Sequence, residues 1–295
     1  MMMIFGKPAP LLFGQLLLGI VNGSFYAMLS LGLAVIFGIL NIINFAHGAL
    51  FMVGAFSAYL LLHWFGIGYW PALVLGPLAV GLFGAAIERV LLRPIRGLDP
   101  LYGLLLTFGL AEVLEGVFTN RFGSSGVTYS VPHLLRGTRD LGFMYLPNYH
   151  AFVVVAAIVV CLATWLVIEK TRLGAVLRAA TENPAIVQAL GIDVPRLVTL
   201  TFAGGVALAA LAGVLAAPMY SVNPGMGSSY ISIVFAVVVI GGMGSIGGAV
   251  FTGFLLGVVE GFTKVFYPPG AATVAFVVMV LVLLLRPAGL FGRSR

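Results

Sequence analysis

The sequence is dominated by apolar runs that are too long for the core of a soluble domain. They fall at about 11–39, 47–65, 70–92, 101–120, 150–169, 198–217 and 270–286, and a further apolar region at 230–263 is long enough for two short or broken passes. About 20 apolar residues in a helix cross the ~30 Å hydrocarbon core of a bilayer. The chain is 61% hydrophobic and only 8% charged, whereas soluble domains have about 25% charged residues. The sequence therefore predicts an all-α polytopic membrane protein with about eight spans, some of them broken or re-entrant.

Positive charges indicate which loops face the cytoplasm. Ten of the 15 Lys and Arg residues fall at three places, namely the loop at 89–96, the central segment 170–197 and the end of the chain from Arg286. Cytoplasmic loops carry an excess of Lys and Arg, so we expect all three places on the cytoplasmic side. The segment 121–149 is then an extracytoplasmic loop. The whole chain, 1–295, is expected to form one transmembrane domain.

The N-terminal end is compatible with two topologies. Residues 11–39 form one long tilted helix, which places the N-terminus outside, or 11–29 span the bilayer and 30–40 re-enter as a half-helix, which places it inside. Lys7 favours the inside, so the second topology is preferred. The run lacks a signal-peptide cleavage pattern, and we expect it to remain as the first span.

The two ends of the chain repeat one plan. The apolar run 30–40 leads to the break NIINFAHG at 41–48, and a helix, a turn and another span follow. The apolar run 231–240 leads to the break GGMGSIGG at 241–248, and again a helix, a turn and a span follow. Interrupted hydrophobic segments at matching positions of two repeats are the best sequence indication of a transport site. The alternative is that glycine-rich pieces resemble one another by composition alone.

The two breaks supply the candidate substrate pathway. Polar side chains at membrane depth need internal partners or water, so those at 41–48 can line a cavity, although Asn44 and His47 can instead cap the start of a helix. The glycines at 241–248 resemble a turn that exposes its backbone. By contrast, Gly253, Gly257 and Gly261 lie four residues apart and are expected to form a smooth helix face for close packing. The candidate pathway residues are Asn41, Asn44, Phe45, His47, Gly48, Gly241, Gly242, Gly244, Ser245, Gly247 and Gly248.

The central polar segment contains a short helix that is marked at both ends. Asn183 is a candidate N-cap, Pro184 a first helical residue, and Gly191 a left-handed stop after the last one. Ile186 and Leu190 lie one turn apart and form an apolar face. Such a helix is a candidate handle on which a cytoplasmic partner pulls. The alternative is an ordinary basic loop.

Several functions are excluded by what the sequence lacks. No G-x-x-x-x-G-K-[ST] motif is present, so the chain does not bind ATP through a P-loop. The four His and the single Cys show no metal-ligand spacing. No Ser/His/Asp or Cys/His pattern indicates catalysis. We therefore expect no metal, no cofactor and no enzymatic activity.

Carboxylates at membrane depth leave a second function open. Glu112 and Glu115 lie three residues apart in the 101–120 span, and Glu260 lies near the outer end of its helix. Intramembrane carboxylates are typical of proton relays, so a proton-coupled secondary carrier that uses Glu112 and Glu260 is the main alternative. Burial against Arg121 or proximity to the interface explains Glu115 equally well. A membrane scaffold without transport activity would not need the polar breaks.

Four separated motifs resemble one family of membrane proteins. NIINFAHGALFMVGAF at 41–56 resembles the INFAHG motif of branched-chain amino-acid ABC-transporter permeases, and the match continues at 178–194, 239–253 and 286–292. These motifs occur in order and span most of the chain, and they look most similar to the H-type subunit of the H/M permease pair.

The resemblance implies a fold and a set of partners. It implies a type II ABC importer-like permease in two repeat-like halves, which works with an M-type permease, two cytoplasmic ATPase subunits and an extracytoplasmic substrate-binding protein. The segment 170–197 would be the coupling segment on an ATPase. Its candidate residues are Arg178, Glu182, Asn183, Pro184, Ile186, Leu190 and Gly191. Leu, Ile or Val is the expected substrate, and related permeases carry other small amino acids, short amides or urea.

Overall fold

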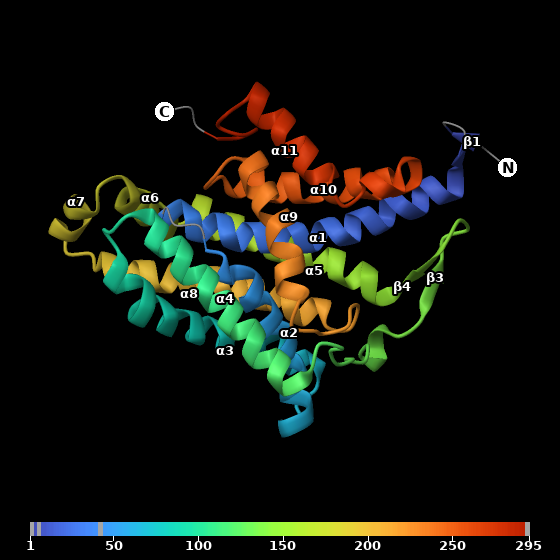
Figure 1. Ribbon diagram of the computed structural model, residues 1–295, viewed down its shortest axis with the longest axis horizontal. Coiled ribbons are helices and arrows are strands. Elements are labelled where there is room, and N and C mark those ends of the chain that lie inside the picture. Colours follow the sequence, from blue (N-terminus) through green and yellow to red (C-terminus); the bar gives the residue numbers. More distant parts are fainter. Residues whose placement is uncertain (1–2, 5–6, 41–43, 293–295) are drawn as a thin grey trace. The chain divides into compact units, whose positions relative to one another are not determined.

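The computed structural model describes residues 3–4, 7–40 and 44–292 and is mostly helical (Figure 1). The α-helices are α1 (Ala9–Leu40), α2 (Ala46–Phe65), α3 (Tyr69–Ile87), α4 (Pro100–Phe122), α5 (Asn148–Lys170), α6 (Arg172–Glu182), α7 (Pro184–Ala189), α8 (Val194–Ala216), α9 (Met226–Gly241), α10 (Ile246–Phe266) and α11 (Val274–Leu285). The short elements are the π-helical turn η1 (Glu88–Leu92), the 3-10 turns η2 (Arg93–Ile95), η3 (His133–Leu135) and η4 (Pro268–Gly270), and the strands β1 (Met3–Ile4), β2 (Lys7–Pro8), β3 (Thr138–Asp140) and β4 (Tyr145–Pro147).

Seven helices of the described chain are long and apolar enough to cross a bilayer, namely α1, α2, α3 with its η1–η2 extension, α4, α5, α8 and α10. Two shorter apolar helices, α9 and α11, have 16 and 12 residues. The prediction of two short or broken passes at 230–263 is thus half right, because α9 is short while α10 has 21 residues. The predicted last span at 270–286 is longer than the helix observed there, since α11 has only 12 residues.

Contacts between residues divide the chain into two compact units. Unit 1 consists of Met1–Ser30, Val131–Leu162 and Ile233–Arg295, and unit 2 consists of Leu31–Ser130 and Ala163–Ser232. Unit 2 contains the end of α1, the first break, α2 and α3. Unit 1 contains the end of α9, the second break, α10 and α11. Each unit therefore holds one copy of the helix, break, helix, turn and helix plan that the sequence predicts.

The first helix is continuous, and the predicted re-entrant half-helix at 30–40 is wrong. Helix α1 runs through 32 residues, which at 1.5 Å per residue is about 48 Å and exceeds the thickness of the hydrocarbon core. No proline interrupts its interior, and Gly32 is tolerated because it packs closely: an added Cβ would lie 2.7 Å from the Gly205 carbonyl oxygen of α8. The structure therefore matches the first of the two N-terminal alternatives.

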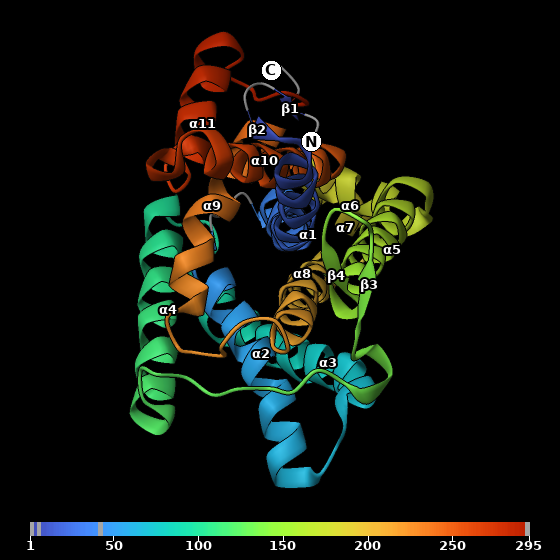
Figure 2. The same cartoon turned by 90° about the vertical axis from the view of Figure 1, so that its right-hand side faces the viewer.

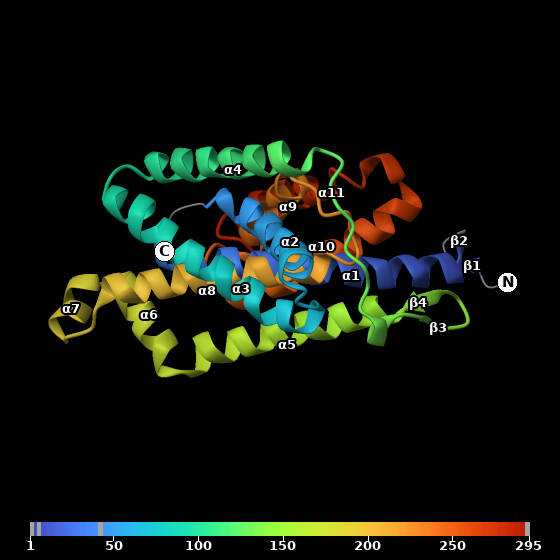
Figure 3. The same ribbon diagram turned by 90° about the horizontal axis from the view of Figure 1, so that it is seen from below.

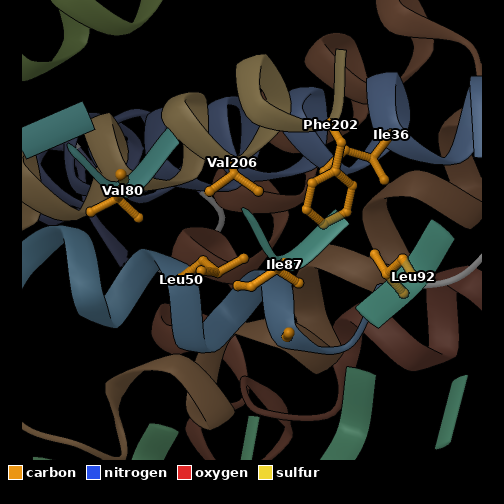
Figure 4. Packing of buried hydrophobic residues seen from close by; sticks show 9 residues of the cluster. Ile36, Leu50, Val80, Ile87, Leu92, Phe202 and Val206 are labelled. Atoms are coloured by element: carbon orange, nitrogen blue, oxygen red, sulfur yellow. The ribbon is translucent and has the colours of Figure 1, made fainter. Parts of the chain in front are cut away.

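In unit 2, helix α8 packs against both α2 and α3, and these three helices lie side by side (Figures 2 and 3). Small residues allow this close approach, because a Cβ at Gly54 of α2 would lie 2.4 Å from the Ala210 backbone, and one at Gly84 of α3 would lie 2.9 Å from Val206 Cβ. The core between them is the cluster of Ile36, Ala46, Leu50, Val80, Ile87, Leu92, Phe202, Val206 and Ala210 (Figure 4).

In unit 1, the glycine face predicted on α10 packs against α1. A Cβ at Gly253 would lie 2.5 Å from the Ala27 backbone nitrogen, and one at Gly257 would lie 2.4 Å from the Gly19 carbonyl oxygen. Glycines four residues apart expose the backbone along one helix face, so two helices can approach until only backbone separates them. The structural interpretation of these glycines is confirmed.

The segment expected to be extracytoplasmic contains a hairpin that the sequence analysis missed. Strands β3 and β4 pair antiparallel with Arg139 opposite Leu146, and Asp140 accepts a hydrogen bond from the Gly142 amide in the turn. The hairpin lies beside the start of α1 (Figure 2), where the rings of Phe13 and Phe143 are 5.7 Å apart. Tyr129 lies earlier in the same segment, within unit 2, and its burial raises the pKa of its phenol.

Candidate pathway and coupling sites

The first break is shorter than predicted. Helix α1 continues to Leu40 and α2 begins at Ala46, so His47 and Gly48 belong to a helix rather than to the break. Asn41 lies outside the described residues. Of the remaining candidates, Asn44 and Phe45, it is Phe45 that connects the break to α4: its amide donates to Thr107 Oγ1 at 3.2 Å and its ring packs edge-on against Phe108.

Asn44 does not cap α2. The N-cap position is Phe45, which has helical dihedrals and no side-chain cap, and only the backbone carbonyl of Asn44 accepts from the His47 amide. The Asn44 side chain is 2% exposed, and neither its oxygen nor its nitrogen has a hydrogen-bond partner among the described residues. A buried amide without partners costs free energy, so the capping alternative does not explain this residue.

His47 and Gly48 lie at helix contacts within unit 2. The His47 ring is fully buried and faces Gly32 of α1, where an added Cβ would lie 3.0 Å from His47 Cε1. A Cβ at Gly48 would lie 2.5 Å from the carbonyl oxygen of Gly227. Backbone fills the space that a Cβ at Gly48 would need, so Gly48 shapes the packing of α2.

The second break is a tight turn of four residues, Gly242–Ser245, between α9 and α10. Gly242 and Gly244 have φ of 98° and 82°, which only glycine adopts at low cost. Ser245 is the N-cap of α10, and its hydroxyl accepts from the Gly248 amide. Each of these residues thus has a role in forming the turn.

Two candidate glycines of this region, Gly241 and Gly248, allow α9 and α10 to approach closely, and a third, Gly247, has no such role within the described chain. A Cβ at Gly241 would lie 2.6 Å from the carbonyl carbon of Gly248, and one at Gly248 would meet the Gly241 carbonyl oxygen still more closely. A Cβ at Gly247 would meet no atom of the described residues within 4 Å. Gly241 and Gly248 therefore shape the turn, and Gly247 is the position where an added side chain has space.

The RPAGLFG stretch packs on the second break. The amides of Leu290 and Phe291 donate to the carbonyls of Ile240 and Gly241, and the Phe291 ring packs edge-on against Phe251 of α10. Two motifs about 45 residues apart in the sequence thus form one structure within unit 1. Arg293 and Arg295 lie outside the described residues.

The capped helix in the central segment forms as predicted. Asn183 Oδ1 accepts from the Ile186 amide at 3.2 Å, Pro184 begins α7, and Gly191 has φ of 83°. Ile186 and Leu190 are 59% and 74% exposed. Two large apolar side chains are therefore exposed on α7, the short helix that follows α6 in Figure 1.

Helix α6, which precedes α7, was missed by the sequence analysis. It forms a buried cluster with α7 and α8 through Ala180, Val187, Val194 and Val198. The signal was present as an apolar residue every three or four positions from Leu173 to Ala180, but no proline marks the start of α6 and no glycine follows its end. Because Val187 is buried in this cluster, α7 is fixed to the first turns of α8.

Arg178 and Glu182 differ in how the structure uses them. Arg178 Nη1 donates to the Ile168 carbonyl at 2.8 Å and lies 3.5 Å from Glu169 Oε2, which joins α6 to the end of α5. Glu182, the last residue of α6, is exposed. Arg178 therefore has an intramolecular role in addition to any contact with a partner.

The carboxylates of the carrier hypothesis lie in different environments. Glu260 accepts from the Tyr26 hydroxyl at 2.6 Å and pairs with Lys264 Nζ at 2.6 Å. Glu115 is half-buried, with Oε1 facing Gly225, and Glu112 is exposed on α4. Glu260 is thus held by two local partners, Tyr26 and Lys264.

Glu88, which is 0% exposed, was not predicted from the sequence. It pairs with Arg96 and accepts a hydrogen bond from Thr199 Oγ1 at 2.5 Å. No local pattern indicates this site, because Thr199 is 111 residues away in the sequence. Among the described residues, no group of His, Cys, Asp and Glu is arranged to hold a metal ion.

These features define an all-α, multi-pass membrane permease, with interrupted helices at matching places and a rigid helix that presents apolar side chains outside the spans. A family model described as the permease component of branched-chain amino acid transport systems matches residues 15–285. The chain belongs to this family of inner-membrane transport proteins, whose members are transport subunits rather than enzymes.

Relatives of known name cover nearly the whole chain. It is 35% identical to the high-affinity branched-chain amino acid transport system permease protein BraD of Pseudomonas aeruginosa and 32% identical to LivH of Escherichia coli, each over 95% of both chains. It is 28% identical to LivM of Salmonella typhimurium, over 92% of this chain and 68% of that protein. No solved structure matches the chain, so the type II importer-like arrangement stays a prediction.

Proposed function

We propose that this chain is the H-type permease subunit of an ABC importer that moves Leu, Ile, Val or related small amino acids inward. Its proposed partners are an M-type permease, two cytoplasmic ATPase subunits and an extracytoplasmic substrate-binding protein. The proposal is supported by relatives of both the LivH and the LivM type and by the family match. Proton coupling has no comparable support.

The observation that carries the energy coupling is helix α7. Its exposed Ile186 and Leu190 suit an apolar groove on an ATPase, since an amphipathic helix in a groove is held mainly by such anchors. Val187 fixes the helix to α6 and α8, so a force on the anchors acts on α8 rather than on a flexible loop. Arg178 and Glu182 would lie at the rim of this contact.

For the substrate pathway we retain Asn44 as the principal candidate. Its amide is buried and has no partner among the described residues, so it can exchange hydrogen bonds with a passing polar group or water at membrane depth. Phe45 and His47 flank it, and the proposed role of Gly48, Gly241, Gly242 and Gly248 is to allow the close packing that shapes each break. Gly244, Ser245 and Gly247 would form the accessible surface of the second break.

The N-terminus belongs on the extracytoplasmic side in this proposal. The start of α1 contacts the β3–β4 hairpin through Phe13 and Phe143, and the hairpin lies in the segment 121–149 that the charge pattern assigns to the outside. This reverses the preference based on Lys7, because a direct contact between α1 and the hairpin is stronger evidence for the topology than a single charge. Single cysteines near Phe13 and Gly137 should react with an impermeant reagent in intact cells, while one near Arg178 should not. Labelling of the Arg178 position would refute the topology.

The test of the function is purification in mild detergent followed by reconstitution. We expect the chain to co-purify with a second permease and with ATPase subunits, and proteoliposomes of this complex to take up Leu, Ile or Val when ATP and the binding protein are present. Uptake driven by a proton gradient in the absence of ATP would instead establish the carrier. A complex that hydrolyses ATP but takes up only another amino acid, an amide or urea would correct the substrate alone.

A further inference from the structure

We infer that Glu88 is a positioning residue that connects the movement of the α7 coupling helix to the first break. This inference rests on the proposed function and names a part of its mechanism that lies inside the membrane domain. Glu88, its partners Arg96 and Thr199, helix α7 and the core around Ile36 and Ala46 all lie within unit 2.

The Glu88 carboxylate bridges two elements that are remote in sequence. It lies at the end of α3 and is fully buried, yet both of its oxygens have partners: Arg96 pairs with Oε1, and Thr199 of α8 donates to Oε2 at 2.5 Å. Hydrogen bonds to an ionised group are shorter and about twice as strong as neutral ones. The carboxylate thus joins α3, the η2 turn and α8 at one point.

Irregular helical turns are needed for the Arg96 contact. Eight residues of regular α-helix would separate Glu88 from Arg96 by about 12 Å along the axis. Here the π-helical turn η1 and the 3-10 turn η2 follow one another, and Arg96 has extended dihedrals. Irregular turns of this kind within helices often occur at functional sites, and this one brings Arg96 back to Glu88.

The cluster is connected to the coupling helix on one side. Val187 of α7 packs with Val194 and Val198 in the first turns of α8, and Thr199 is the next residue after Val198. A displacement of α7 by a docked ATPase therefore moves Thr199, because close-packed side chains transmit strain.

On the other side, the cluster is connected to the first break. Ile87 and Leu92, which flank Glu88, belong to the same packed core as Ile36 of α1 and Ala46 of α2 (Figure 4). These last two residues lie on either side of the break at 41–45. The path from α7 to the break is therefore continuous through α8, Glu88 and this core.

The test uses the complete reconstituted transporter and three variants. Thr199→Val removes one link to Glu88 and leaves the Arg96 pair in place. Glu88→Leu combined with Arg96→Leu replaces the ion pair with apolar side chains, a change that often preserves stability. Thr201→Val is the matched control on α8, because the Thr199 and Thr201 hydroxyls both contact the carbonyl four residues earlier, Pro195 and Leu197, whereas among the described residues Thr199 is the one of the two that also contacts Glu88.

Assembly, basal ATP hydrolysis, hydrolysis stimulated by the loaded binding protein, and uptake per ATP would be measured for each. We expect the Thr199 variant and the double variant to assemble and to hydrolyse ATP at the basal rate, with stimulation and uptake lowered about tenfold, the factor for one hydrogen bond to a charged group. The Thr201 variant should match the wild type.

A purely structural role predicts a different pattern. Loss of assembly in the double variant with normal stimulated hydrolysis in the Thr199 variant would overturn the inference, as would normal uptake per ATP in both. The variant Ile186→Ala with Leu190→Ala, run in the same assay, separates a failure of the proposed role of α7 from a failure of the proposed role of Glu88. If that variant also retains full coupling, the role of α7 fails, whereas a normal Thr199 variant beside a defective α7 variant rejects only the role of Glu88.

Discussion

The most direct test of the coupling helix is to truncate both of its exposed apolar side chains. Ile186→Ala with Leu190→Ala leaves the buried Val187 and the Asn183 cap unchanged, so α7 should still form on its base. The expected result is weaker association with the ATPase subunits and lower uptake, with the spans inserted normally. The cause would be the loss of apolar area that only the partner can bury.

The magnitude follows from the exposure of the two side chains. Fully burying a Leu or Ile side chain contributes about 1.5–3 kcal/mol, and Ile186 and Leu190 have 59% and 74% of their surface left to bury. Scaled by these fractions, the pair contributes about 2–4 kcal/mol of binding free energy, which corresponds to about thirtyfold to a thousandfold in affinity.

The assay is the amount of ATPase retained on the purified permease in a dilution series, together with substrate-stimulated hydrolysis. Gln188→Ala is the matched control, because Gln188 is exposed on the same helix but points about 200° away from Ile186. It should bind as the wild type does. If the double alanine variant retains ATPase within about threefold of the wild type, the anchors are not buried in the complex and the reasoning fails.

Three further predictions concern the breaks and the energy source. Gly248→Ala should disrupt the turn between α9 and α10 and lower thermal stability or uptake, because its Cβ would overlap the Gly241 carbonyl. Gly247→Ala is the control and should be neutral, because its Cβ would meet no atom of the described residues within 4 Å. Equal behaviour of the two variants in melting and uptake assays would contradict the packing argument. Asn44→Leu should raise the melting temperature, because it removes a buried amide that has no partner within the described part of the chain and costs about 1–3 kcal/mol. It should also lower uptake, and unchanged uptake would remove Asn44 from the pathway. Glu112→Gln should leave ATP-driven uptake intact, because no protonation step enters the proposed cycle, and a dead Glu112→Gln beside fully active α7 variants would favour the proton-coupled carrier.

The local features of this protein could be predicted from the sequence. The apolar runs gave the long spans because each helix satisfies its own backbone, so length and hydrophobicity suffice. The ends of α7 were predicted residue by residue, since Asn183, Pro184 and Gly191 act through their own dihedrals and nearest amides. The glycines of α10 were assigned to packing correctly because a four-residue spacing fixes one helix face. The four motifs carried the family assignment for the same reason, since they are read along the chain.

Only the tertiary structure decided what depends on contacts between distant residues. It shortened both breaks and made α1 continuous, because helix ends depend on packing as well as on composition. It also showed that the Asn44 amide is buried and does not cap α2, and that Glu260 forms a local ion pair with Lys264. Glu88 is the clearest case: its burial and its bond to Thr199 arise because α3 and α8 pack together, and a lone Glu at the end of an apolar run has no signature that specifies a partner 111 residues further along the chain.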